Sequence, residues 1–369
     1  MPSDPAGPMT PTAPTFAVFD LGGTWFRWGC YRPTHGLTDC KRVPALNYLS
    51  HPSSSAADLQ IALSDFIVSH VCELRNDNRP EIQVVGVSIG APVNAHDMTV
   101  LGSGPLWGRE ARPFPLHDRL RKSSPDLQWH VINDVTALLA PYMRDDTSYL
   151  KTMLITVSSG IGSRLYDHRT HRIPYDEKYG VQGEIGHLVC SFEFDGRRIN
   201  RLCECGGWNH VNAFSSGRGI AETLRELPSL TASYHDMFEA SPTSWHAASD
   251  EYRLKALREA LQRGNDSAAA LLEAFVTPLS RTLATALTLD PEIDRIVMTG
   301  GVVHGLGKYY REALQRTFLR EELYQITPND PNYLTRRLHW EDVDDYSGLR
   351  GAGLYAASLD RESRNGRSN

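Results

Sequence analysis

The stretch FAVFDLGGTWFRWGCYR, residues 16–32, decides the fold class of this chain. Its apolar start, residues 16–20, is rich in β-forming side chains and stops at a Gly-Gly pair, and alternating bulky residues resume over 25–32. This pattern predicts a β-hairpin. The run MLITVSSGIGSRLYD, residues 153–167, repeats the design with an apolar strand, a turn of small residues and a returning strand.

Helical stretches such as 56–74 separate further strand-like runs at 82–93 and 129–134, which indicates an α/β protein. Two similar halves joined near residue 134 account for this order. The predicted organisation is a disordered Pro-rich leader (1–15), a small α/β domain (16–134 with 346–360), a large α/β domain (135–345) and a disordered tail (361–369).

Three helices are predicted in the second half of the chain, and one of them is KYYREALQRTFL, residues 308–319, which follows a strand and a Gly-Gly turn. The apolar positions of residues 265–289 fit a long amphipathic helix, with Asp266 or Ser267 as its cap. The small residues of 348–359 are typical of a helix that packs close to a neighbour.

Composition excludes several classes of function. The chain has 369 residues, 41% of them hydrophobic, and a formal net charge of -6, so it has no electrostatic footprint for nucleic acid. No apolar run approaches the roughly 18 residues of a membrane span, and the N-terminus lacks the features of a secretory signal. Because there is no electrostatic footprint for nucleic acid, small molecules are the expected partners. Six cysteines are too sparse for a disulfide scaffold, which indicates a reducing, cytoplasmic compartment. The prolines of the leader could alternatively form a PxxP docking segment.

The turn DLGGT, residues 20–24, has the features of a phosphate-binding loop. Gly22 and Gly23 let backbone amides approach an anion, and Thr24 adds a hydroxyl. Asp20, at the strand end, would serve Mg²⁺ or a water of its shell. A plain hairpin turn with a solvated aspartate is the alternative.

Two further turns of small residues follow apolar strands, SSGIGS at 158–163 and TGG at 299–301. Three such turns favour phosphate binding over coincidence, although the chain contains neither a GxxxxGK[ST] loop nor a GxGxxG fingerprint. The phosphate-contacting residues expected in the two later turns are Ser159, Gly160, Gly300 and Gly301.

Asn133 and Asp134 stand where a strand runs into a helix. A carboxylate there can accept the proton of an attacking hydroxyl, while the amide holds a neighbouring hydroxyl. The alternative is that the pair only caps the helix. In GEIGH, residues 183–187, Glu184 could bind sugar hydroxyls and His187 could bind a hydroxyl or a metal.

Nine stretches, in this order, resemble the ROK sugar kinases (repressor, open reading frame, kinase), which include bacterial glucokinases. The stretches are FDLGGT, VGVSIGAPV, PLWG, INDVTALL, SSGIGS, GVQGEIGH, CECGGWNH, MTGGVV and GAGLYAA, and they span roughly residues 16 to 360. The resemblance implies an actin-like fold of two α/β domains with a cleft between them, and ATP and Mg²⁺ as co-substrates. It also implies a homodimer and a hexose-like acceptor whose primary hydroxyl is phosphorylated. Asp134 would be the catalytic base. The acceptor-binding residues would be Asn133, Glu184, His187, Gly90 and the position of Asn212.

Three departures from the family pattern stand out. The second phosphate turn, GTGIGGG in the family, here ends in Ser163 and Arg164, and this arginine could add a compensating charge. Trp25 replaces a smaller or basic residue and is interpreted as packing. Asn212 replaces a glutamate used near the anomeric end of the sugar, so an amino sugar or a C7 cyclitol becomes a plausible acceptor beside glucose.

The string CECGGWNH, residues 203–210, could be a metal site, a redox pair or a tight turn. A Cys203–Cys205 disulfide would close a very tight ring in a reducing compartment, and redox pairs usually follow a CxxC pattern. Zinc requires four nitrogen or sulfur ligands, and the chain offers two of each. We therefore predict a closed, structural zinc site formed by His187, Cys203, Cys205 and His210, although the family has cysteine at position 210.

Two alternatives to a kinase use the same pocket. A transcriptional regulator of this family would sense a sugar, but it carries a helix-turn-helix domain ahead of the first phosphate turn, where this chain has 15 Pro-rich residues. A non-catalytic sugar binder would explain the altered second turn, but Asp20, Asn133 and Asp134 are retained.

Overall fold

The computed structural model describes residues 14–77, 81–108, 112–143 and 148–366. The chain forms two compact units, one of Met1–Pro141 with Asp345–Asn369 and one of Tyr142–Asp344. Most of the predicted leader, 1–13, lies outside the described residues. No helix in the described ranges combines the length and apolar character needed to cross a membrane.

The first unit is built on a five-stranded sheet in the order β3-β2-β1-β4-β5. The first two strands form the predicted hairpin, and β1 also pairs in parallel with β4, which in turn pairs in parallel with β5. The strands are β1 (Phe16–Leu21), β2 (Trp25–Arg32), β3 (Gly36–Pro44), β4 (Val84–Ile89) and β5 (Gln128–Asn133).

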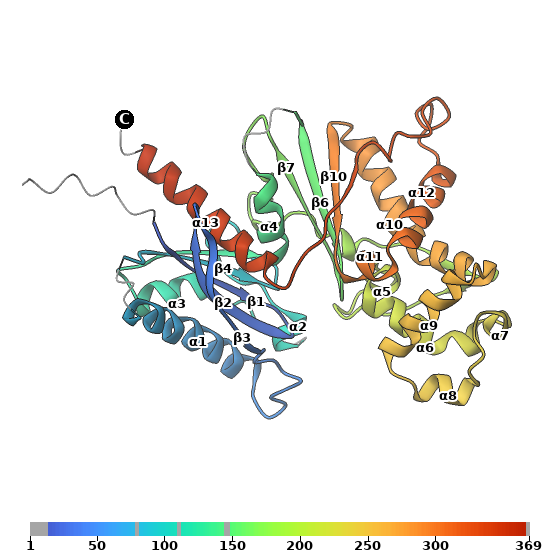
Figure 1. The fold of residues 1–369 in the computed structure, drawn as a ribbon, viewed down its shortest axis with the longest axis horizontal. Helices are drawn as coiled ribbons and strands as arrows, with labels where there is room; N and C mark the ends of the chain where they lie inside the picture. The colour runs from blue at the N-terminus through green and yellow to red at the C-terminus, as the bar shows by residue number, and fades with distance from the viewer. Residues whose placement is uncertain (1–13, 78–80, 109–111, 144–147, 367–369) are drawn as a thin grey trace, which may run out of the picture. The chain divides into compact units, whose positions relative to one another are not determined.

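Helices cover both faces of this sheet (Figure 1). Along β1, Phe19 and Leu21 belong to the core under α1, α2 and α3, whereas Phe16 and Val18 pack against α13 on the opposite face. This alternation is the period of two that a strand buried on both faces requires. The helices are α1 (Ala56–Asn76), α2 (Gly104–Trp107), α3 (Leu116–Ser123), α4 (Asp134–Leu139) and α13 (Ser347–Gly366).

The second unit contains a four-stranded sheet in the order β11-β10-β6-β7. The antiparallel pair β6–β7 is the second predicted hairpin, and β10 pairs in parallel with both β6 and β11. The strands are β6 (Lys151–Val157), β7 (Ile161–Asp167), β10 (Ile293–Thr299) and β11 (Leu338–Trp340), with a separate pair β8 (Phe192–Phe194) and β9 (Arg197–Ile199).

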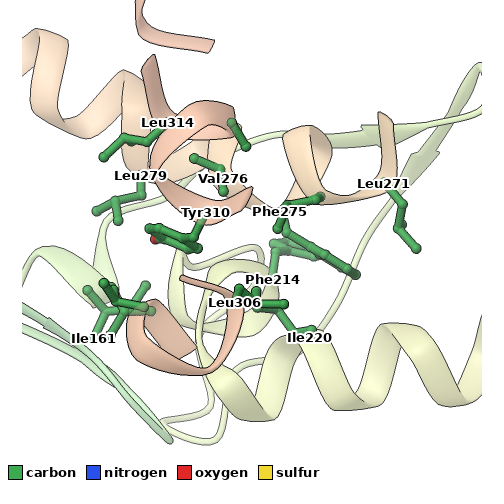
Figure 2. Close-up of a cluster of buried hydrophobic side chains, with 14 of the residues drawn as sticks. Ile161, Phe214, Ile220, Leu271, Phe275, Val276, Leu279, Leu306, Tyr310 and Leu314 are labelled. Atoms are coloured by element: carbon green, nitrogen blue, oxygen red, sulfur yellow. The ribbon is translucent and has the colours of Figure 1, made fainter. Parts of the chain in front are cut away.

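Helices α10 and α12 pack against each other and against α5, α6 and α11 in a large apolar core (Figure 2). Phe275 and Tyr310 lie at its centre with Phe214 beneath them, and all three are almost fully buried. The helices of this unit are α5 (Asn212–Ser215), α6 (Gly217–Leu230), α7 (Tyr234–Met237), α8 (Pro242–Ala247), α9 (Asp250–Gln262), α10 (Asp266–Leu289), α11 (Gly301–Leu306) and α12 (Lys308–Glu321), with 3₁₀ turns at η1 (Ala140–Tyr142) and η2 (Ile185–His187).

The structure corrects three expectations about boundaries. The cap of α10 is Asn265, whose side chain accepts from the amide of Ala268, so Asp266 is the first helical residue. The tail predicted to be disordered from residue 361 continues α13 as far as Gly366. The first unit extends past the predicted boundary at residue 134 to Pro141, because α4 packs against α13.

Candidate functional site

The first predicted phosphate turn is anchored to the rest of its unit by its carbonyl groups. The side-chain amide of Asn47 donates to the Gly23 carbonyl at 2.8 Å, and the Ala45 amide donates to the Thr24 carbonyl at 2.9 Å. A Cβ on Gly23 would lie 2.7 Å from the Cβ of Pro105, so only glycine fits this position. The turn is therefore held rigidly between β1 and β2.

The side chain of Asp20 lies mostly buried at the end of β1. Ser88 Oγ donates to Asp20 Oδ1 at 3.1 Å, and an Arg27 nitrogen lies 3.5 Å from Oδ2. Gly348 of α13 packs so closely that a Cβ there would lie 2.6 Å from Oδ1. Burial raises the pKa of Asp20 despite the opposing effect of Arg27. A carboxylate in this environment would gain from a nearby divalent cation, so these surroundings fit a role beside Mg²⁺.

Ser88 and Arg27 were not predicted to be partners of Asp20. Both left a signal in the sequence. Ser88 is the polar residue inside the apolar run VVGVSI, and a buried hydroxyl needs a hydrogen-bond partner. Arg27 lies directly opposite Asp20 in the antiparallel β1–β2 pairing, where oppositely charged side chains meet.

Trp25, interpreted as a packing residue, carries the guanidinium of Arg42 over its ring at 4.7 Å from the centroid. Arg42 also pairs with Asp345 at 2.8 Å. The cationic group beside the first turn is thus supplied by β3, and the aromatic ring holds it in place.

Asn133 is the cap of α4. Its Oδ1 accepts from the Val135 amide at 2.9 Å, and its Nδ2 donates to the Ala91 carbonyl at 2.9 Å and to Asp134 Oδ1 at 2.8 Å. Both amide protons of Asn133 are therefore used within the protein, and a contact with an acceptor would use the second lone pair of Oδ1. The capping role, which the sequence left as an alternative, is confirmed.

Asp134 is the first residue of α4, where the helix dipole stabilises a negative charge. One carboxylate oxygen accepts from Asn133, and the other lies next to Gly90, where a Cβ would be 3.7 Å away. The Gly90 amide in turn donates to the Leu21 carbonyl at 3.0 Å. Three strand ends, those of β1, β4 and β5, thus bring Asp134 and Gly90 close to the first phosphate turn within one unit.

The structure brings the other two phosphate turns together in the second unit. The hydroxyl of Ser158 accepts from the Gly301 amide at 3.4 Å, and the Ser158 carbonyl accepts from the Gly217 amide at 2.7 Å. Gly300 has φ of 110°, and a Cβ there would lie 2.4 Å from the Val157 carbonyl oxygen. The backbone can follow this path only with glycine.

Asn212, the first residue of α5, connects the β6–β7 turn to the segment that contains Glu184. Its Oδ1 accepts from the Ile161 amide at 2.7 Å. Its amide group also lies against Gly186, where a Cβ would be 2.6 Å from Oδ1. The position predicted to face the acceptor therefore also orders the turn that contains Ser159 and Gly160.

Arg164 does not extend toward the phosphate turn, contrary to the expectation of a compensating charge there. The residue is 1% exposed, and its guanidinium donates to the carbonyl groups of Ser163 and Gln182. An Arg164 nitrogen lies 3.6 Å from Glu184 Oε1. The arginine is thus directed at the segment predicted to bind the acceptor.

The four predicted metal ligands converge. The ligand atoms of His187, Cys203, Cys205 and His210 all lie within 4.8 Å of one another. The Nδ1 atom of His210 is 3.1 Å from the Cys205 sulfur and 3.4 Å from the Nδ1 of His187. Ligands of a tetrahedral zinc ion are about 3.3 to 3.8 Å apart, given bonds of about 2.0 to 2.3 Å. Two thiols and two imidazoles at this spacing fit zinc.

The surroundings of these ligands also suit a metal. Burial lowers the pKa of His210, with a further contribution from His187, so the imidazole is held in its neutral, metal-binding form. Burial raises the pKa of Cys203, a thiol that a metal would deprotonate. A Cβ on Gly207 would lie 2.2 Å from the His210 ring, so glycine is required beneath that ligand.

Asn209, which directly precedes the predicted ligand His210, has φ of 57°. Asparagine is among the few residues other than glycine that adopt this left-handed conformation readily. Its Oδ1 accepts from the Arg201 amide at 2.9 Å, so the side chain adds a contact that glycine could not make.

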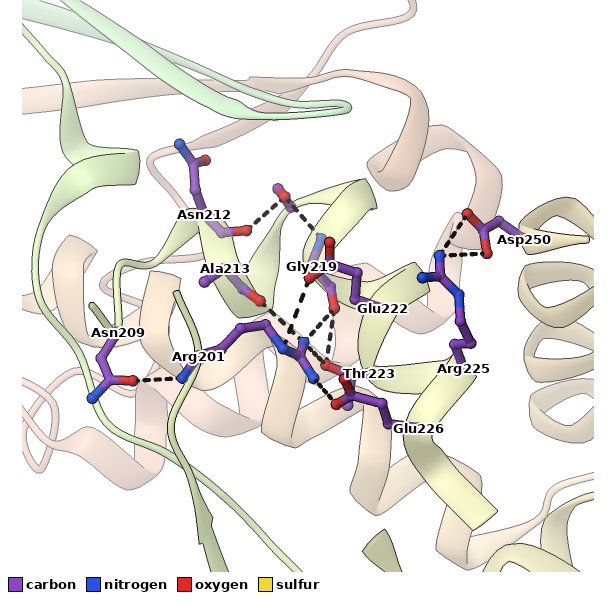
Figure 3. A network of polar contacts seen from close by, with 11 residues as sticks. Arg201, Asn209, Asn212, Ala213, Gly219, Glu222, Thr223, Arg225, Glu226 and Asp250 are labelled. Carbon is purple, nitrogen blue, oxygen red and sulfur yellow. Dashed lines mark hydrogen bonds and ion pairs between the residues drawn. The ribbon is translucent and has the colours of Figure 1, made fainter. Parts of the chain in front are cut away.

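Arg201 joins this loop to α5 and α6 (Figure 3). The residue is 8% exposed, and its guanidinium donates to the carbonyl groups of Ala213 and Gly219 and to Glu226. Arg201 was not among the predicted site residues. Arg201 therefore attaches the N-terminal end of the ligand-bearing loop to α5 and α6, and at its other end the chain enters α5.

Two α/β units, each containing an antiparallel hairpin with a turn of small residues, define an actin-like ATPase fold. The model of the ROK family matches residues 18–358, and the chain belongs to this family. The resemblance inferred from the ordered motifs is thereby confirmed.

Named relatives support the assignment. The chain is 38% identical over 348 residues to "2-epi-5-epi-valiolone 7-kinase" of Actinoplanes sp., with 92% of each chain covered. It is 29% identical to a "C(7)-cyclitol 7-kinase" of Streptomyces hygroscopicus subsp. limoneus, over 95% of this chain and 96% of the relative. The fold is similar to that of a ROK hexokinase from Thermus thermophilus, with a TM-score of 0.64 at 20% identity over 94% of this chain and 99% of the other.

Proposed function

We propose that this protein is an ATP-dependent kinase that phosphorylates the primary hydroxyl of a C7 cyclitol or a similar sugar-like acceptor. The observation that carries the proposal is Asp134, a carboxylate at a helix start, held by Asn133 and placed close to a glycine-rich phosphate turn. The kinase named for 2-epi-5-epi-valiolone, at 38% identity, supports a cyclitol as the acceptor.

In this proposal Asp134 accepts the proton of the attacking hydroxyl. The hydroxyl oxygen forms a bond to the γ-phosphorus of ATP, the bond from that phosphorus to the β–γ bridging oxygen breaks, and ADP leaves. Asn133 fixes the orientation of the carboxylate through its 2.8 Å hydrogen bond. Phosphoryl transfer depends mainly on such positioning and on charge neutralisation.

The nucleotide would be bound by the glycine-rich turns. In the first unit Gly23 and Thr24 would contribute backbone amides to phosphate oxygens, while the Gly22 amide donates within the turn to the Trp25 carbonyl at 3.1 Å. In the second unit Ser159, Gly160 and Gly300 are the expected phosphate contacts, while the Gly301 amide donates to the Ser158 hydroxyl. Mg²⁺, when bound, neutralises charge on the phosphates, and Asp20 is the residue that would serve the ion or its water shell.

In the second unit Glu184 and His187, with help from Asn212, would bind the acceptor. In the first unit Gly90, which lies beside Asp134, is the expected contact. Asn212 supplies a neutral amide where the family has a carboxylate. This difference removes a charged hydrogen-bond acceptor at the anomeric end of a sugar, and a cyclitol has no anomeric centre. The relatives named as cyclitol kinases support the same conclusion.

A structural zinc ion, a homodimer and a cytoplasmic location complete the proposal. Zinc at His187, Cys203, Cys205 and His210 would have four protein ligands and no open position, so it would act on the fold and not on phosphate. By fixing His187 it would orient the neighbouring Glu184. The retained Asp20, Asn133 and Asp134 argue against a non-catalytic binder.

The test is acceptor-dependent release of ADP. Purified protein is incubated with MgATP and each of a panel of hexoses, amino sugars and C7 cyclitols, and the phosphorylated product is identified by mass spectrometry. We expect turnover with C7 cyclitols. No acceptor-dependent ADP from any member of the panel would refute the kinase.

An Asp134→Asn variant tests the role of the base. Removal of a general base typically costs about 10²- to 10⁴-fold in turnover, with acceptor binding largely kept. Asp266→Asn is a matched control, because Asp266 is also the first residue of a helix capped by an asparagine. Turnover of Asp134→Asn equal to that of the control would remove Asp134 from this role.

A further inference from the structure

We propose that Arg164 is a positioning residue that orients Glu184 and thereby selects neutral polyhydroxy acceptors over acceptors that carry an amine. The inference rests on the proposed function and specifies its substrate class. Its starting point is a guanidinium that is 1% exposed and lies 3.6 Å from Glu184 Oε1.

The backbone that carries Glu184 is docked on β7. The Gly183 carbonyl accepts from the amide and the hydroxyl of Ser163 at 3.1 Å and 2.9 Å, and the side chain of Gln182 accepts from the Leu165 amide at 3.1 Å. Gly183 has φ of 79°, and a Cβ there would lie 2.2 Å from the Ser163 carbonyl oxygen. These contacts fix the main chain but leave the side-chain torsions of Glu184 unrestrained.

Arg164 supplies the missing restraint. Its guanidinium donates to the carbonyl groups of Ser163 on β7 and of Gln182 before Gly183, so the planar group is itself held in place. A rigid cation close to Oε1 restricts the carboxylate to a narrow range of orientations. The Glu184 side chain is 37% exposed, so the carboxylate is anchored by its partner and still reachable by an acceptor.

The pair also sets the charge that an acceptor meets. A buried arginine remains protonated and needs a counterion, and Glu184 provides one. The positive charge of Arg164 offsets part of the negative charge of Glu184, so the carboxylate attracts an ammonium group less than a lone carboxylate would. It still accepts hydrogen bonds from hydroxyl groups. This balance favours a neutral cyclitol or hexose.

The experiment is a double-mutant cycle on Arg164→Met and Glu184→Gln, read as KM for acceptor, KM for ATP and kcat. Without Arg164, the charged hydrogen bond between Glu184 and the acceptor should be misdirected. We therefore expect the acceptor KM of Arg164→Met to rise about 10- to 100-fold, while its KM for ATP stays within about twofold of the unsubstituted value. The double variant should be no worse than Glu184→Gln alone, because Arg164 acts through Glu184. The ratio of kcat/KM for neutral and aminated acceptors should fall in Arg164→Met.

Arg253→Met is the matched control for loss of a buried arginine in the same unit. Arg253 is 2% exposed and donates to the carbonyl groups of Trp245, His246 and Ala248, which lie in and beside α8. We expect it to lower stability without changing the acceptor KM. Arg164→Lys keeps the positive charge and can be tested if Arg164→Met does not fold. We expect its acceptor KM to rise less than tenfold.

Four results would overturn the proposal. They are additive effects in the cycle, an equal rise in acceptor KM in Arg253→Met, an unchanged ratio of kcat/KM between neutral and aminated acceptors, and an effect of Arg164→Met or Arg164→Lys on KM for ATP alone.

Calorimetric measurement of acceptor binding without nucleotide distinguishes failure of this inference from failure of the proposed kinase activity. An acceptor that binds in an Arg164-dependent way but is never phosphorylated refutes only the kinase, and a panel that neither binds nor turns over refutes both.

Discussion

A Gly351→Ala substitution should destabilise the first unit, because α13 packs on α4 with no room for a side chain. A Cβ on Gly351 would lie 1.9 Å from the Ala137 carbonyl oxygen and 2.5 Å from its carbonyl carbon. Ordinary contact begins near 3.4 Å, so the two helices would have to separate by about 1.5 Å.

The size of the effect follows from this geometry. Overpacking typically costs about 1 to 3 kcal/mol, and the atoms that clash here are backbone atoms that cannot rotate away. The better helix propensity of alanine returns about 1 kcal/mol. With an overpacking cost near the upper end of its range, the net loss in the free energy of unfolding is about 2 kcal/mol. This loss should lower the melting temperature by about 4 to 8 °C.

The assay is thermal and urea unfolding followed by circular dichroism, together with turnover. Since α4 begins at Asp134, a displaced α4 should also reduce kcat. Gly305→Ala is the control, because Gly305 lies in α11 with no atom near the position of an added Cβ. An unchanged melting temperature and urea midpoint for Gly351→Ala would refute the packing argument.

Two further predictions concern metal and pH. Purified protein should contain about one zinc per chain by elemental analysis, and His210→Ala should reduce this content; a zinc-free preparation with full activity would contradict the site. Burial lowers the pKa of His130 to about 4 from a reference of 6.5, so the unfolded chain binds more protons below pH 6.5. The contribution of His130 to stability should therefore fall by about 2 kcal/mol as the pH is lowered from well above 6.5 to 5, and His130→Gln should remove this part of the pH dependence in urea titrations at both pH values.

Elements with strong local patterns could be predicted closely. The strand predicted over 25–32 is β2 without change, and the second hairpin and α12 lie where the apolar patterns indicated. The cap of α10 was misassigned because Asn265, Asp266 and Ser267 are all good capping residues, and only the chain path at Asn265 decides among them. The last turns of α13 were missed because a polar helix end resembles a disordered tail in composition.

In the candidate site, too, some features could be predicted from the sequence and others could not. Asp134, the glycine turns and the four metal ligands were identified because each has a distinctive residue type at a distinctive spacing. The roles of Arg164 and Arg201 were not, since an arginine in a sequence gives no sign of which carbonyl groups it will meet. Asn133 was named, but its use of both amide protons within the protein could not be foreseen.

The amino-acid sequence alone determined the order of motifs, the hairpins, the family and the residues able to hold zinc. These features can be recognised from residue type and from spacing along the chain, which the sequence gives directly. Tertiary structure alone decided that Arg164 is directed at Glu184 and that Asn212 reaches the β6–β7 turn. Each of these contacts depends on how strands and helices pack, and small shifts in packing determine which buried polar group finds which partner.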